Sequence, residues 1–103
     1  MKIITINRAT LDGLRLCTGE LFECNGFQFC LTKVGNVFYA IEVLSGFSAY
    51  SIYQFELTDL GCRRKIKTWI RENAHRFNPE LVEKIKKQSR IHRVQYPLNE
   101  RIV

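Results

Sequence analysis

The sequence lacks long apolar runs and is poor in glycine and proline. No stretch approaches the roughly 18 apolar residues that a membrane-spanning helix needs, and none resembles a secretory signal peptide. Six glycines and two prolines among 103 residues are too few for a fibrous or low-complexity protein. We therefore expect a soluble globular protein that does not attach to membranes, with the cytoplasm as its default location.

The cysteines lack the spacing of a metal site. Cys17, Cys24, Cys30 and Cys62 contain no Cys-x-x-Cys pair, and no histidine stands at ligand spacing from them. A secreted, disulfide-bonded mini-protein would be richer in cysteine. The sequence therefore predicts free thiols that pack as small apolar side chains, with no bound metal and no cofactor.

Motifs of catalysis are also missing. There is no glycine-rich phosphate loop, no nucleophile elbow and no paired carboxylates. One exception is left open, because Cys62 lies near the start of a predicted helix beside Arg63, and both features favour a thiolate. Its position on the apolar side of that helix argues for burial, and His75 lies several turns away. We predict that the protein is not an enzyme, and we infer no small-molecule substrate.

The composition is that of one globular domain. Hydrophobic residues make up 46% and charged residues 25% of the chain, and 103 residues leave room for a single unit. The domain, 1–103, divides into a β-rich part at 1–57, a basic helical segment at 58–91 and a tail at 92–103. The order of strands before helices predicts the α+β class, with a small antiparallel β-meander of three to five strands and two C-terminal helices packed on it.

Two turn sequences define the meander. Asn25-Gly26 is typical of a type I′ hairpin turn and Gly35-Asn36 of a type II′ turn. They predict strands at about 20–24, 27–34 and 37–44. The cross-strand pairs that follow are Cys24 with Phe27, Phe22 with Phe29, Val34 with Val37, Thr32 with Tyr39, and Cys30 with Ile41.

The flanking segments carry weaker signals. Residues 2–7 are rich in β-branched side chains and predict a short strand. Residues 8–19 contain Gly13 and Gly19 and are interpreted as an irregular connection. We expect a further strand near 47–52, after the Ser45-Gly46 break.

The helices have clear starts. Thr58-Asp59 predicts a capped N-terminus. Apolar residues then recur with helical spacing, which predicts a helix at about 59–76. Asn78-Pro79 starts a second helix that should end near Arg90.

Both faces of the predicted sheet are apolar. One face, the aromatic face, consists of Phe22, Cys24, Phe27, Phe29, Leu31, Phe38 and Ala40. The other face consists of Leu21, Cys30, Val34, Val37, Tyr39, Ile41 and Val43. Either the flanking segments cover both faces, or the aromatic face is the interface of a homodimer or partner complex. Its interface residues would be Phe22, Phe27, Phe29 and Phe38.

Positive charge is concentrated in the C-terminal part. Residues 1–60 hold four basic and six acidic side chains, whereas residues 61–103 hold twelve basic and four acidic ones. Clustered lysine and arginine side chains bind backbone phosphates and release condensed counterions. A solvated charged helix face is the alternative, which the interruption by Glu72, Glu80 and Glu83 favours. The predicted nucleic-acid-binding residues are Arg63, Arg64, Lys67, Arg71, His75, Lys86 and Arg90.

The stretch from Phe38 to Ser48, an aromatic strand that ends in Ser45-Gly46 and leads to a helix at Thr58, resembles small phage- and plasmid-borne accessory proteins. The resemblance covers about a third of the chain and implies a mobile-element protein that binds nucleic acid or blocks a host protein.

The functional prediction is a small non-catalytic module that contacts DNA or RNA backbones through the basic helical stripe. The alternative is a protein-interaction module or homodimer that uses the aromatic face, as an inhibitor of a host protein would.

Overall fold

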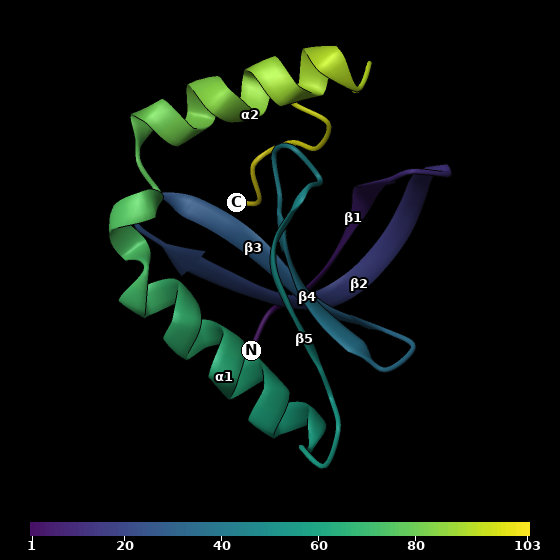
Figure 1. Ribbon diagram of the computed structural model, residues 1–103, viewed down its shortest axis with the longest axis vertical. Coiled ribbons are helices and arrows are strands. Elements are labelled where there is room, and N and C mark those ends of the chain that lie inside the picture. Colours follow the sequence, from purple (N-terminus) through teal and green to yellow (C-terminus); the bar gives the residue numbers. More distant parts are fainter.

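The computed structural model describes all 103 residues and consists of one antiparallel sheet followed by two helices (Figure 1). The five strands lie side by side in sequence order, so the sheet is a meander. The predicted α+β fold, with a meander and two C-terminal helices, is confirmed. The strands are β1 (Ile3–Thr10), β2 (Gly13–Cys24), β3 (Phe27–Val34), β4 (Val37–Glu42) and β5 (Ser48–Tyr53). The helical elements are α1 (Asp59–Glu72), the 3-10 turn η1 (Ala74–Arg76) and α2 (Pro79–Ile91).

Both predicted hairpin turns form. Asn25 and Gly26 have φ angles of 55° and 84°, as a type I′ turn requires, and the turn pairs Cys24 with Phe27. Gly35 has a φ of 61° at the first central position of the second turn, which pairs Val34 with Val37. Every cross-strand pair that the turns predict is present.

The irregular connection predicted at 8–19 is wrong. These residues belong to β1 and β2, which pair without interruption from Ile3 opposite Glu20 to Thr10 opposite Gly13. Leu11 and Asp12 alone form the turn, and the Thr10 hydroxyl accepts the Asp12 N–H at 3.2 Å. The central residues, Leu11 and Asp12, are not the usual glycine or asparagine, and the glycine of this turn, Gly13 with a φ of 102°, comes one position later.

The helices begin where predicted. The Thr58 hydroxyl accepts the N–H of Gly61 at 3.0 Å, and the Asn78 side chain accepts the N–H of Leu81 at 3.0 Å. The predicted end of the first helix at 76 is wrong, because α1 ends at Glu72. The Asn73 side-chain amide donates to the Trp69 carbonyl at 2.8 Å, and a short 3-10 turn follows.

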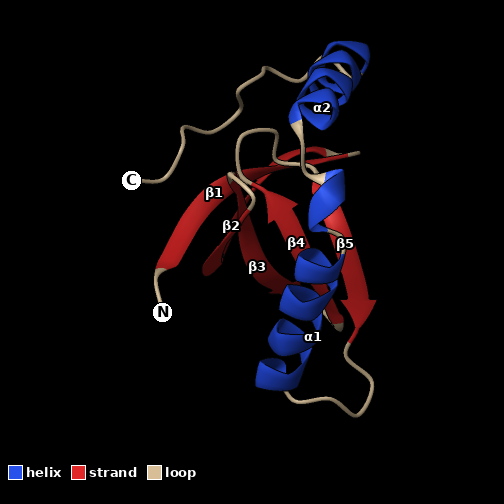
Figure 2. Ribbon diagram, turned by 90° about the vertical axis from the view of Figure 1, so that its left-hand side faces the viewer, coloured by secondary structure: helices blue, strands red, loops and turns tan.

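The first core lies between the aromatic face and α1 (Figure 2). Phe29 and Phe38 are buried in it, and the Phe77 ring contacts Phe29 edge-on with a centroid distance of 5.1 Å. These two strand residues therefore have no surface to offer a partner, and of the four predicted interface residues only Phe22 and Phe27 keep partial exposure. The helical side of this core is formed by Cys62, Ile66, Ile70 and Phe77.

The second core lies on the opposite face of the sheet, and the flanking segments cover it. Ile4 and Ile6 of β1 pack there with Cys30 and Ile41 of the central strands. The C-terminal segment 92–103 contains no helix or strand, yet it packs along the molecule, and Ile102 closes this core.

Two amide side chains hold the C-terminal segment. Asn99 donates to the carbonyls of Asn7 and Val43 at 2.8 Å. Gln28 donates to the Ile102 carbonyl at 2.7 Å and accepts its N–H at 2.8 Å. Both sheet faces are therefore covered within one chain.

Candidate nucleic-acid interface

Most helical cations are exposed and form no ion pair. They lie on α1, η1, α2 and the residues that follow, and together they give this part of the surface its positive charge. The exposed, unpaired cations of residues 61–93 are Arg64, Lys65, Arg71, Arg76, Lys84, Lys87, Arg90 and Arg93.

Glu20 neutralises part of the predicted stripe. This carboxylate lies buried on β2, and its Oε1 is 3.4 Å from the Nε of Arg63. Its other oxygen pairs with the Nζ of Lys67. Both cationic side chains are only 24% exposed. The three groups together keep a single positive charge, and two predicted phosphate ligands are engaged inside the protein.

Arg71 lies over an aromatic ring next to this cluster. Its guanidinium is 5.1 Å from the centre of the Phe22 ring, and the Lys67 ammonium is 5.8 Å from the same ring. Such contacts stabilise by about 0.5–1 kcal/mol at exposed sites. Phe22 therefore holds Arg71 against β2 while leaving it exposed to solvent. We call Arg64, Lys67 and Arg71 the α1 basic face, since their spacing places them on one side of the helix.

The remaining predicted ligands are less well placed. His75 lies on η1, because α1 ends before it, so the predicted row is interrupted after Arg71. Lys86 turns toward Glu83, at 3.5 Å, and toward the Tyr96 ring. Arg90 is exposed and unpaired. The structure thus brings Arg63, Arg64, Lys67 and Arg71 together on α1 and leaves the others apart.

All four cysteines are free thiols, and Cys17, Cys30 and Cys62 are buried. Cys62 is fully buried beneath α1, so its thiol has no exposed surface. Cys17 and Cys30 meet in the second core, where their hydrogen bond lowers the pKa of Cys17 and raises the pKa of Cys30. Arg8 further lowers the pKa of Cys17, while burial acts in the opposite direction. No group of three histidine, cysteine, aspartate or glutamate side chains converges as a metal site would require.

The sequence interpretation missed Glu20, whose carboxylate pairs with two of the predicted nucleic-acid-binding residues, Arg63 and Lys67. Glu20 lies more than forty positions before Arg63, and no local pattern links the two. Only the stacking of α1 on β2 places them side by side. β2 also holds Arg15 and Glu23, so a charged residue in this strand does not single out Glu20.

Comparison with known proteins adds no function. The chain matches no protein-family model, no curated protein and no solved structure. Neither helix combines the length and the apolar character that crossing a membrane requires. The resemblance of 38–48 to phage- and plasmid-borne accessory proteins therefore stays a prediction.

Proposed function

We propose that the protein binds the phosphate backbone of nucleic acids, with little sequence preference, through the α1 basic face. One observation carries the proposal: of the twelve basic residues in 61–103, only Arg63, Lys67 and Lys86 form ion pairs. The others have no carboxylate partner. A surface with this many uncompensated cations attracts polyanions.

The α1 basic face suits a phosphate backbone better than α2 does. Exposed arginines can donate two hydrogen bonds to one phosphate, and Arg64 and Arg71 are two turns apart on one side of α1. On α2 the exposed lysines Lys84 and Lys87 share their side of the helix with Glu80 and Glu83. These carboxylates reduce the local potential, so we assign α2 a secondary role.

The two exposed arginines of α1, Arg64 and Arg71, provide the test. The double substitution Arg64→Gln/Arg71→Gln should lower the affinity for a labelled 20-base-pair DNA duplex by about tenfold at 50 mM salt. The slope of log K against log salt should become shallower by about 1.8, because each lost phosphate contact removes about 0.9. Fluorescence anisotropy at 50 and 200 mM salt measures both quantities.

The double variant Lys2→Gln/Arg15→Gln is the matched control. It removes the same charge from exposed residues of the N-terminal half. An equal loss in the control would show that net charge alone attracts DNA, and binding without salt dependence would contradict the proposal altogether.

A separate observation favours a second candidate, self-association through β2. The Leu21 N–H donates to the Lys2 carbonyl, so odd-numbered residues of β2 direct their backbone groups to β1. Even-numbered residues direct theirs to the other edge, where β3 pairs only from Glu20 onward. Leu14 and Leu16 therefore have no strand partner on that edge, and their side chains are 49% and 74% exposed. Unpaired apolar edges of this kind add further strands.

The partner that this edge fits is a second copy of the chain. An antiparallel pair centred on Leu16 places Leu16 opposite its own copy, and the two-fold symmetry closes the assembly at two chains. Sedimentation velocity should show a dimer whose fraction rises as the protein concentration is raised from about 10 to 500 µM. Leu16→Lys should abolish it, whereas Leu11→Lys, at the hairpin tip, should not. A monomer throughout this range would rule out the second candidate.

A further inference from the structure

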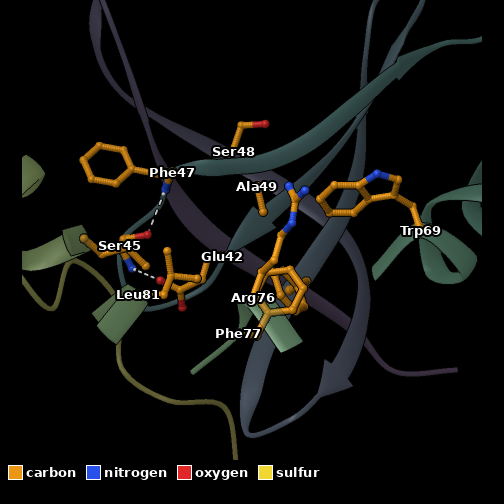
Figure 3. A pocket seen from close by; sticks show the side chains of 11 residues that line it. Glu42, Ser45, Phe47, Ser48, Ala49, Trp69, Arg76, Phe77 and Leu81 are labelled. Carbon is orange, nitrogen blue, oxygen red and sulfur yellow. Dashed lines mark hydrogen bonds between the residues drawn. The ribbon is translucent and has the colours of Figure 1, made fainter. Parts of the chain in front are cut away.

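A cavity of about 280 Å³ lies beneath α2, where the sheet meets the end of α1 and η1 (Figure 3). Its volume is about twice that of the apolar cavities of ~150 Å³ that admit benzene. It opens to solvent beside the exposed residues Ser48 and Arg76. The walls are formed mainly by Phe29, Phe47, Trp69, Phe77, Leu81 and Ile85.

Almost every polar side chain of the lining already has a partner. The two carboxylate oxygens of Glu42 accept the N–H groups of Leu44 and Ser45, at 2.9 and 3.0 Å. The Ser45 hydroxyl accepts the Phe47 N–H at 3.2 Å, as the dashed line in Figure 3 shows. The Ser48 hydroxyl donates to the Tyr50 carbonyl. These hydrogen bonds fix the connection between β4 and β5, so the groups that form them are not free to bind a ligand.

Arg76 is the exception. Its side chain extends past Phe77 toward Ala49 and Trp69 (Figure 3). The guanidinium forms no ion pair, not even with Glu42. A permanently charged group with unused donors at the mouth of an apolar cavity is complementary to an anion with an apolar body.

We propose that this cavity binds a small monocarboxylate, whose apolar body fills the space under α2 and whose carboxylate pairs with Arg76. The guanidinium donates two parallel hydrogen bonds to the carboxylate, a geometry that a lysine does not offer. The buried charge of Glu42 on the floor limits the ligand to one negative charge, held at the mouth. The site does not depend on the α1 basic face, to which Arg76 does not belong.

The cavity contains its own reporter. Trp69 is the only tryptophan of the chain, and it lines the cavity. It stacks on Tyr50 with a centroid distance of 4.2 Å and an angle of 9° between the rings. A ligand that enters the cavity replaces water next to the indole, so Trp69 fluorescence should change with occupancy.

Octanoate and its neutral counterpart octanamide test the proposal, because both are transparent where tryptophan emits. Titration of the whole chain with octanoate should give a saturable change in Trp69 fluorescence, and octanamide should bind more weakly. Arg76→Gln should weaken the binding of octanoate about tenfold, the effect of losing a charge-assisted pair, and leave the binding of octanamide unchanged. Arg93→Gln, an exposed arginine outside the lining, is the matched control.

A second variant tests the cavity itself. Ala49→Leu places a larger side chain in the cavity and should weaken the binding of octanoate and octanamide alike. The proposal is overturned by the absence of a saturable Trp69 response in the parent protein, by equal affinities for octanoate and octanamide, or by equal effects of Arg76→Gln and Arg93→Gln. Unchanged binding in Ala49→Leu would also overturn it. Circular dichroism of each variant confirms that the fold is retained.

Discussion

Replacing Gly19 with alanine is expected to lower the free energy of unfolding by about 3 kcal/mol or more. A Cβ at this position would overlap the Leu31 carbonyl oxygen and lie only 2.6 Å from the Leu31 carbonyl carbon. These are backbone atoms of the neighbouring strand, so they can yield only if β2 and β3 move apart. Overpacking of a rigid site typically costs about 1–3 kcal/mol, and this overlap lies at or beyond that limit.

Urea denaturation followed by circular dichroism measures the effect. Gly61→Ala is the control, because its Cβ would meet side chains and no backbone, Thr58 at 3.1 Å and Leu57 at 3.9 Å, and alanine favours the helix. We expect the free energy of unfolding of Gly61→Ala to stay within about 1 kcal/mol of that of the parent protein. A Gly19→Ala variant as stable as this control would refute the close approach of the two strands.

The large effect at Gly19 follows from its place in β2, directly before the residue at which the strand begins to pair with β3. Before Glu20 the strand pairs with β1 alone, Glu20 pairs with both neighbours, and after Glu20 the strand pairs with β3. Gly19 also lies next to the second core, because a Cβ there would be 3.1 Å from the Cys30 sulfur, and Cys17 and Cys30 both belong to that core. A methyl group at Gly19 would therefore loosen this core as well as the strand pairing.

Local signals explain which parts of the fold the sequence predicts. Asn25-Gly26 and the caps at Thr58 and Asn78 act within a few residues, so the turn, its register and the helix starts could be predicted. The β1–β2 hairpin was not predicted, because its turn is centred on Leu11-Asp12 with Gly13 only after the centre, and the close approach at Gly19 depends on Leu31.

In the candidate site, too, some features could be predicted from the sequence and others depend on tertiary packing. The concentration of cations after residue 61 is a property of the sequence, and so is the row formed by Arg64, Lys67 and Arg71. The pairing of Glu20 with two of the cations depends on tertiary packing. The cavity beside Arg76 depends on it as well, because strands, η1 and both helices contribute to its walls.

Glu20→Gln is expected to strengthen nucleic-acid binding by about tenfold or more at 50 mM salt. The change removes the negative charge that neutralises Arg63 and Lys67 and keeps the shape of the side chain. Two further cations then become available to phosphates, which should steepen the salt slope by up to about 1.8. Anisotropy titrations against the same 20-base-pair DNA duplex measure both changes.

The same substitution should make the fold less stable, which separates the two roles of Glu20. Removing one partner leaves two partly buried cations unpaired, at an expected cost of about 1–3 kcal/mol, since both keep some contact with water. Glu23→Gln is the matched control, because Glu23 is exposed on the same strand and forms no ion pair. Equal gains in affinity for both variants would mean that only net charge matters. A gain confined to Glu20→Gln, together with a loss of stability, would identify this carboxylate as the group that both holds α1 on the sheet and restrains the α1 basic face.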